Sequence, residues 1–236
     1  MTKPAPSAAA GQDALARLDA VKAKRGYLLP HHGLLAITAP ELLAGYDACY
    51  TALTLVPRHL SPREREFVWL GVLNVRRESI ASQHLTKFKA AGGTQEEVEL
   101  IVRLSALAEG AGAFDFIAEH WQHHLTGYDR AAVYAEAFQR LIAGTTVRLP
   151  LVHMAAAAIH ACLQRHLTLA WHIAECYRLK TDEYELSEAL SYVMFSGSVP
   201  YYIEACGVWQ QMIRRGDLAA TPPFATWAAI DSGGPG

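Results

Sequence analysis

Apolar residues recur along most of this chain at intervals of three and four residues, and alternating strand-like patterns are scarce. That spacing places side chains on one face of an α-helix. Residues 13–24 show it clearly, because Leu15, Leu18 and Val21 share one stripe and Gly26 follows as a helix stop. The pattern therefore predicts an all-α protein.

Three helix starts can be predicted from capping residues. Thr38 is expected to cap a helix that follows it. Ser61 with Glu64, and Thr94 with Glu97, have the spacing of a capping box. In such a box the side chains of the two residues satisfy each other's free backbone N–H groups. These starts divide the first half of the chain into separate helices.

The C-terminal tail from Gly216 is rich in proline and glycine and is predicted to be irregular. Phe224, Trp227 and Ile230 are apolar residues within it. They suggest that the tail docks on a surface, and a neighbouring subunit is one candidate for that surface.

Two long stretches of the chain share an order of landmarks, which predicts an internal duplication. The paired positions are Glu78 with His166, His84 with His172, and Trp121 with Trp209. The predicted organisation is an N-terminal extension with a short helix (1–29), a first helical unit (30–121), a second, diverged unit (122–215) and the tail (216–236). Each unit is small, so each is expected to need the other to bury its apolar face.

Composition narrows the classes of function. Hydrophobic residues make up 51% of the 236 residues, and the formal net charge is −2. Without a basic excess, a nucleic-acid partner is not expected. No apolar run approaches the roughly 20 residues of a membrane span, and the N-terminus does not look like a secretory signal. A cytoplasmic location is the expectation, with the four cysteines as free thiols outside any C-x-x-C pair.

Residues 60–66 read Leu-Ser-Pro-Arg-Glu-Arg-Glu, and His84 follows Glu66 by eighteen positions, after an apolar helix. With the Gly92-Gly93 break, these features resemble the carboxymuconolactone decarboxylase family, which includes the alkylhydroperoxidase D branch. The resemblance extends over roughly residues 30–215. It implies an all-α fold made of a duplicated alkylhydroperoxidase D-like helical unit. It also implies a homo-oligomer, with a trimer favoured.

The peroxidase branch of that family carries C-x-x-C before the histidine, whereas residues 77–84 contain no cysteine. The sequence therefore resembles the decarboxylase branch more closely. Carried over position by position, Glu66, Glu78 and His84 match functional positions in the first unit. In the second unit only His172 matches. His166 stands in the place of Glu78, and Met154 or the adjacent His153 in the place of Glu66.

The resemblance implies acid/base chemistry on a small unsaturated or cyclic carboxylic acid, without a cofactor or a metal, and these residue types suit it. His84 is expected to transfer a proton near neutral pH. Glu78 is expected at a helix N-terminus, where the helix dipole favours a carboxylate. Glu66 would orient the imidazole or serve as a second acid. The substrate-binding candidates are Arg76, Arg77 and Trp69. Decarboxylation, isomerisation and lactone hydrolysis would all need these parts. The resemblance to the decarboxylase branch implies a cofactor-independent lyase.

Other interpretations remain open at this stage. His84 and His172 could be structural histidines, and Glu66 could form a surface ion pair. A thiol-dependent peroxidase would use Cys162 or Cys176. A non-catalytic oligomeric binding protein of the same fold is the third alternative. The histidines at 153, 160, 166 and 172 lack the i, i+4 spacing of metal ligands on one helix.

Overall fold

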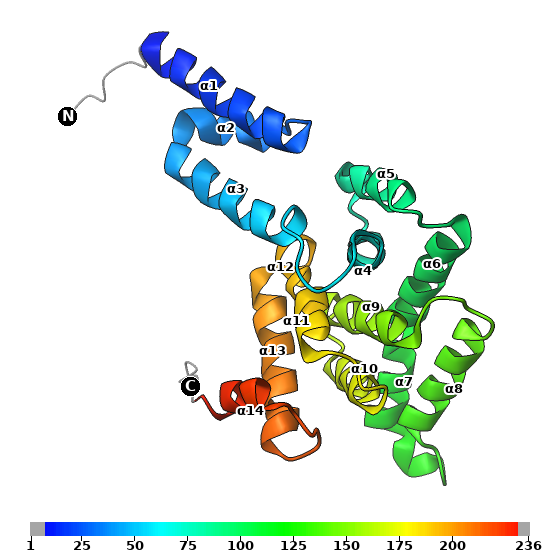
Figure 1. Cartoon of the computed structure of the whole chain (residues 1–236). Coiled ribbons are helices and arrows are strands. Elements are labelled where there is room, and N and C mark those ends of the chain that lie inside the picture. The colour runs from blue at the N-terminus through cyan, green and yellow to red at the C-terminus, as the bar shows by residue number, and fades with distance from the viewer. Residues whose placement is uncertain (1–7, 231–236) are drawn as a thin grey trace. The chain divides into compact units, whose positions relative to one another are not determined.

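The computed structural model describes residues 8–230, and within this range every regular element is a helix (Figure 1). The predicted all-α class is confirmed. The chain forms two compact units, Met1–Pro57 and Arg58–Gly236.

The first unit contains the helices α1 (Ala8–Arg25), α2 (Pro30–Thr38) and α3 (Pro40–Thr54). Its small core joins Ala14, Ala36 and Leu43, against which Leu18 and Leu35 pack. Gly26 ends α1 with φ +83°, as expected for the residue that follows a helix.

A buried arginine adds polar contacts to this unit. The Arg25 guanidinium lies 3.9 Å from the centroid of the Tyr50 ring, and its Nε donates to Asp47 Oδ1 at 3.0 Å. His32 Nε2 is 3.1 Å from Arg25 Nη1. Burial, followed by the nearby charges of His31 and Arg25, lowers the pKa of His32 to about 4.

The prediction that Thr38 is an N-cap was wrong. Thr38 is the last residue of α2, and its hydroxyl donates to the carbonyl oxygen of Leu34 at 2.8 Å. The chain breaks at Ala39, which has φ −157° and ψ 71°, and α3 starts at Pro40. A threonine side chain can bond back along its own helix as well as cap the next one, and here it does the first.

The second unit contains most of the helices. They are α4 (Pro62–Arg76), η1 (Ser79–Ala81), α5 (Gln83–Ala90), α6 (Gln95–Gly110), α7 (Gly112–Phe116), η2 (Ile117–Trp121), η3 (Gln122–His124), α8 (Arg130–Ile142), α9 (Leu149–Cys162), α10 (His166–Arg178), α11 (Glu183–Ser191), α12 (Val193–Ser196), α13 (Val199–Arg214) and α14 (Pro222–Ala229). Helix α9 is central, because α4, α6, α10, α11 and α13 all pack against it. Every residue from Leu151 to Cys162 is buried.

Small residues allow this close packing. Helix α9 is rich in alanine, and on α4 a Cβ atom added to Gly71 would lie 3.0 Å from Ile159 Cδ1. The two predicted capping boxes are confirmed at the starts of α4 and α6. There the backbone N–H of Ser61 donates to Glu64 Oε2 at 3.0 Å, and that of Thr94 to Glu97 Oε2 at 2.8 Å.

The tail is helical over Pro222–Ala229, so the prediction of an irregular tail was wrong for these residues. Pro222 and Pro223 occupy the first turn of α14, where a missing N–H costs nothing. The tail packs on α13 of its own chain, where Phe224 stacks on Trp209 at a ring distance of 5.2 Å. Residues 231–236 lie outside the described part of the structure.

The boundary between the compact units, at residues 57 and 58, differs from the expected start of a first unit at residue 30. The duplication stays a prediction. A residue in the left-handed conformation follows α4 directly (Arg77, φ 56°), and another lies two positions after the end of α9 (Gln164, φ 55°).

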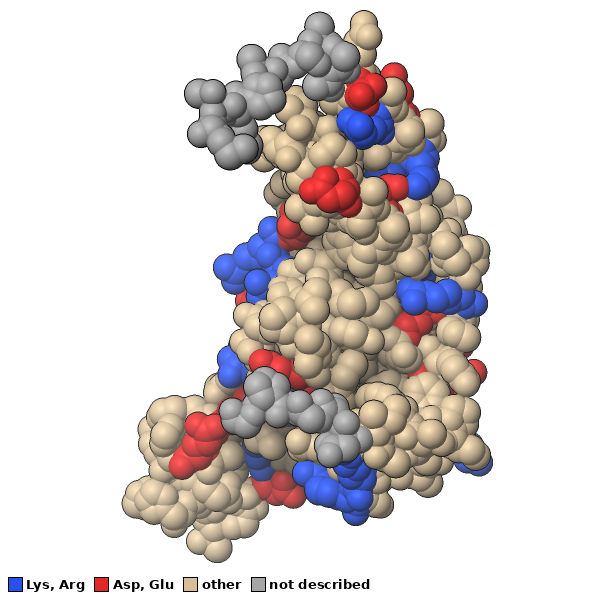
Figure 2. Space-filling model, turned by 90° about the vertical axis from the view of Figure 1, so that its left-hand side faces the viewer, with Lys and Arg blue, Asp and Glu red and all other residues tan. Residues whose placement is uncertain are grey.

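On the face shown in Figure 2, basic and acidic side chains are interspersed. Among the described helices, none is both long and apolar enough to span a membrane.

Candidate functional site

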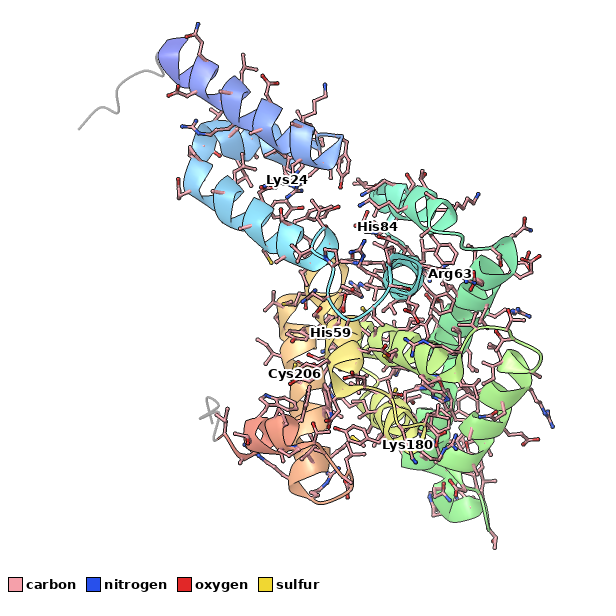
Figure 3. All side chains as sticks on the ribbon, in the orientation of Figure 1. Lys24, His59, Arg63, His84, Lys180 and Cys206 are labelled. Atoms are coloured by element: carbon pink, nitrogen blue, oxygen red, sulfur yellow. The ribbon has the colours of Figure 1, made fainter. Side chains whose placement is uncertain are left out.

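A glutamate on α4 and a histidine on α5 form the candidate site. His84 Nδ1 lies 2.6 Å from Glu66 Oε2, and the two residues are 2% and 1% exposed. The chain leaves α4 through the left-handed Arg77, passes η1 and returns as α5, which packs on α4. Figure 3 shows His84 on this returning segment, close to α4. In the tautomer whose Nδ1–H donates a hydrogen bond to the carboxylate, Nε2 carries no proton and can accept one.

Aromatic side chains extend the site toward α11. The Trp69 ring lies 5.0 Å from the His84 ring and stacks on Tyr192 at 4.9 Å. The Tyr192 hydroxyl donates to Glu188 Oε1 at 2.6 Å. Glu188 Oε2 in turn accepts the backbone N–H groups of His59 and Leu60, at 2.6 and 2.9 Å. This chain of contacts holds the loop that precedes α4 against α11.

Several buried polar atoms at the site have no hydrogen-bond partner among the described residues. They are Glu66 Oε1, Trp69 Nε1 and Arg65 Nε. Arg65 Nε lies 3.7 Å from Glu66 Oε1, which is an ion-pair distance but too long for a hydrogen bond. Buried polar groups are nearly always bonded in folded proteins. An acceptor and two donors left open beside an imidazole therefore offer contacts to a polar ligand.

Three other candidates of this region point elsewhere. Glu78 is exposed, and its Oε1 accepts the backbone N–H of Ile80 at 3.1 Å at the start of η1. Arg77 is exposed and pairs with Glu109 at 3.3 Å. The Arg76 guanidinium donates to the carbonyl oxygens of Ser196 and Cys162, at 3.3 and 3.4 Å. Glu78 was expected at the N-terminus of the helix that carries His84, but that helix, α5, starts at Gln83, and Glu78 precedes the three-residue η1. The side chain of Glu78 caps η1, whereas the partner of His84 is Glu66.

The candidates in the predicted second copy, residues 122–215, are separated from one another. His166 is exposed and lies 3.3 Å from Glu204. His172 is buried, with Nε2 2.9 Å from the Tyr134 hydroxyl and Nδ1 3.1 Å from His153 Nδ1. The Tyr134 hydroxyl also lies 2.8 Å from His160 Nε2. These four buried groups form a histidine network that joins α8, α9 and α10.

Burial keeps this histidine network uncharged. It lowers the pKa of His153 to about 4 and that of His160 to about 3, and it lowers the pKa of His172 well below its usual value. It also raises the pKa of Tyr134. Among the described residues no group of three or more His, Cys, Asp or Glu is arranged to hold a metal ion.

The two thiols considered for redox chemistry are both buried. Burial raises the pKa of Cys162 and that of Cys176 to about 12, so both are protonated at neutral pH. A thiolate is the form that reacts with peroxide or disulfide. Neither residue has the exposed, electropositive surroundings of a redox cysteine.

Residues 40–119 match the carboxymuconolactone decarboxylase family. The match covers about a third of the chain and includes α3 to α7, with Glu66, Trp69 and His84. It does not reach the histidine network. A comparison with curated proteins gave no match, and a comparison with solved structures gave none.

Sequence reasoning identified Glu66, Trp69 and His84 but missed Tyr192 and Glu188. The latter two lie more than a hundred positions away in the chain, and a glutamate in the apolar stretch Leu186–Val193 was the one available signal. Tyr134 was also missed, because nothing in its local sequence connects it with the histidines of α9 and α10.

Proposed function

We propose that this chain is a carboxymuconolactone decarboxylase-like enzyme that transfers protons at the Glu66–His84 pair. Its substrate would be a small unsaturated or cyclic carboxylic acid, and no cofactor would take part. The observation that carries the proposal is the buried 2.6 Å hydrogen bond between these side chains, beside polar atoms without partners. The family match over residues 40–119 supports it.

In a decarboxylation, the C–C bond to the carboxylate breaks, CO₂ leaves, and the electron pair passes into the conjugated ring system. A proton must then be delivered to carbon. His84 would first take up a proton from water on Nε2 to become an imidazolium, which Glu66 stabilises through Nδ1. It would then deliver that proton to carbon and return to the neutral imidazole. Arg65, whose Nε faces Glu66, and the indole N–H of Trp69 would hold the developing anion. Isomerisation or lactone hydrolysis would use the same groups.

A second candidate is a non-catalytic oligomeric binding protein. The nearly complete burial of His84 and Glu66 favours it, because a substrate must reach the imidazole. The raised pKa values of Cys162 and Cys176 weigh against the thiol-dependent peroxidase. A homo-oligomer, with a trimer favoured, and a cytoplasmic location remain part of the proposal.

The test is turnover of carboxymuconolactone by the purified full chain, followed as loss of substrate and release of CO₂. We expect His84→Ala to lower kcat by about 100-fold or more, because general acid catalysis contributes roughly 10² to 10⁴. His166→Ala is the matched control, since His166 is an exposed histidine that contacts Glu204, and it should keep kcat within about threefold. Equal activity of wild type and His84→Ala would refute the assignment. Binding of the substrate without any turnover would favour the non-catalytic protein.

A further inference from the structure

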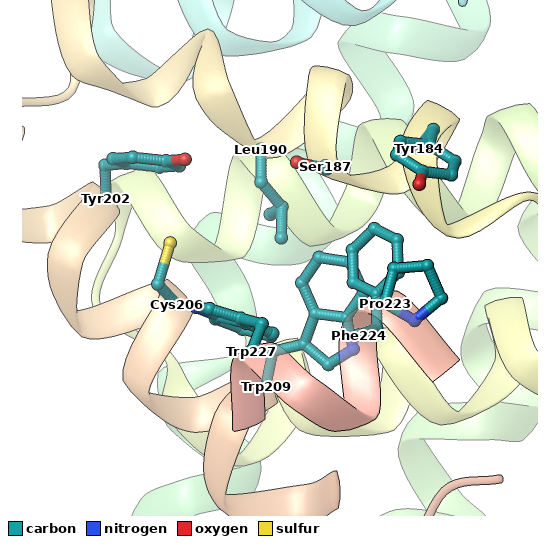
Figure 4. Close-up of a pocket in the computed structure, with 9 residues that line it drawn as sticks. All are labelled: Tyr184, Ser187, Leu190, Tyr202, Cys206, Trp209, Pro223, Phe224 and Trp227. Atoms are coloured by element: carbon teal, nitrogen blue, oxygen red, sulfur yellow. The ribbon is translucent and has the colours of Figure 1, made fainter. Parts of the chain in front are cut away.

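A cavity separate from the Glu66–His84 pair lies between α11, α13 and α14 (Figure 4). Its volume is about 300 Å³, at the lower end of the range for small-molecule sites. Helix α14, which belongs to the C-terminal tail, forms one of its walls. The function proposed above makes no use of this cavity.

Flat aromatic rings form most of the walls. Trp209 of α13 stacks on Phe224 of α14 at 5.2 Å, and Trp227 meets Trp209 edge-on at 5.3 Å. Tyr184 of α11 closes the end near Phe224, with a ring distance of 5.2 Å. Rings arranged in this way offer both faces and edges to a further ring, with the offset and edge-to-face contacts that aromatic pairs prefer.

The polar groups of the cavity are neutral. Ser187 and Tyr202 contribute hydroxyl groups, and Cys206 contributes a thiol. Burial raises the pKa of Tyr202 and of Cys206, so both keep their protons at neutral pH. None of the lining residues is Asp, Glu, Lys, Arg or His. A carboxylate that entered would lose its hydration without gaining a cation.

The wall made by α14 is anchored at both ends. At its start, the backbone N–H of Thr221 donates to Glu183 Oε2 at 3.1 Å. At its end, Gln210 Nε2 donates to the carbonyl oxygen of Trp227 at 3.3 Å, and Arg214 Nε donates to that of Ala228. The indole N–H of Trp209 on α13 donates to the hydroxyl of Tyr177 on α10 at 3.0 Å, which fixes the indole ring. The cavity is therefore formed before any ligand arrives, which lowers the entropic cost of binding.

We propose that this cavity binds an uncharged, planar molecule with one aromatic ring and a hydrogen-bonding substituent. The ring would lie among Trp209, Phe224 and Trp227, and the substituent would meet Ser187, Tyr202 and Cys206. This ligand class differs from the carboxylic acid proposed for the Glu66–His84 pair, so the two sites are distinguished by the charge of what they bind.

The test compares benzamide with benzoate, which have nearly the same shape but differ in charge, by isothermal titration on the full chain at pH 7.5. We expect one benzamide per chain with a Kd on the order of 1 mM or tighter, and benzoate at least about tenfold weaker. Cys206→Phe would place a ring in the cavity and should weaken benzamide at least about tenfold. Cys49→Phe, the same change at an exposed cysteine of the first unit, should leave it unchanged.

A second measurement does not depend on Cys206→Phe folding correctly. In a Cys49→Ser chain, Cys206 is the one cysteine that is not deeply buried, so its alkylation by iodoacetamide at pH 8.5 reports access to the cavity. Benzamide should slow the alkylation several-fold, and benzoate should not. Equal effects of the two compounds, or none, would overturn the proposal. Protection that grows with protein concentration alone would also overturn it, because a second copy of the chain would then cover the cavity.

Discussion

Glu66 and Glu78 are both glutamates close to His84 in the sequence, but their surroundings differ. Glu66 is buried and bonded to the imidazole, whereas Glu78 is exposed and caps η1. Glu66→Gln keeps an acceptor for Nδ1 but removes the charge that stabilises the imidazolium. We expect this change to lower kcat for carboxymuconolactone by about 100-fold with little change in KM. Glu78→Gln should stay within about threefold of wild type.

The control for this pair is partial rescue by Glu66→Asp, which restores the charge on a shorter side chain. A purely structural Glu66 would lower the melting temperature without separating kcat from KM. Equal losses in Glu66→Gln and Glu78→Gln would contradict the role assigned to Glu66.

At this scale the sequence was informative where chemistry follows spacing along the chain. Glu66 and His84, eighteen positions apart, were paired as candidates because the family resemblance matched both to functional positions. Spacing could not show where Arg76 and Arg77 point, because the left-handed turn at Arg77 sends neighbouring side chains in different directions. Contacts across helices, such as Trp69 with Tyr192, required the fold.

Among the elements, α8, α9 and α10 are joined by the histidine network, and this predicts acid sensitivity. In the folded chain His153 and His160 have pKa values of about 4 and 3, and that of His172 is also well lowered. In the unfolded chain a histidine has a pKa of about 6.5. The unfolded state therefore binds more protons below pH 6.5. The stabilisation is fully present above that pH and is lost as the pH falls toward the folded values.

The expected loss at pH 5 is about 2 kcal/mol of unfolding free energy for each histidine, by linkage. Urea unfolding at pH 7.5, 6.0 and 5.0 measures it. His32 in the first unit, with its pKa of about 4, should add to the slope. Replacing His153 by Gln should make the pH dependence shallower, whereas replacing the exposed His166 by Gln should not. A flat stability between pH 7.5 and 5.0 would contradict the neutral state of the network.

Helix starts were predicted correctly where residues close together in the sequence determine them. The capping boxes at Ser61 and Thr94 satisfy their own backbone groups, so no distant contact was needed. The prediction for the tail was wrong because contacts distant in the sequence determine its structure. Its proline and glycine content favours irregular chain. Proline is nevertheless compatible with the first turn of a helix, which is where Pro222 lies. Packing of Phe224 and Trp227 on Trp209 then stabilises that helix.

At the scale of the whole molecule, the family match spans the boundary between the compact units, since residues 40–57 belong to the first and 58–119 to the second. The units differ greatly in what they bury. The core of the first unit centres on Ala14, Ala36 and Leu43, two of which are alanines. The second unit is built around α9, which is buried from Leu151 to Cys162. The first unit also buries Val21, Tyr50 and Leu53. A chain of under 60 residues that buries so few large apolar side chains is marginally stable alone.

We therefore expect a fragment of residues 58–236 to keep its helical circular dichroism and to unfold cooperatively in urea. The fragment 1–57 alone should show low helicity and no cooperative transition. The size of the core decides this, because each ordered residue costs about 1 to 2 kcal/mol of backbone entropy, which only apolar burial can offset. The slope of unfolding free energy against urea concentration scales with the surface that unfolding exposes. The slope of each fragment is compared with that of the full chain. Cooperative unfolding of 1–57, or an unfolded 58–236, would show that the two units share one folding core.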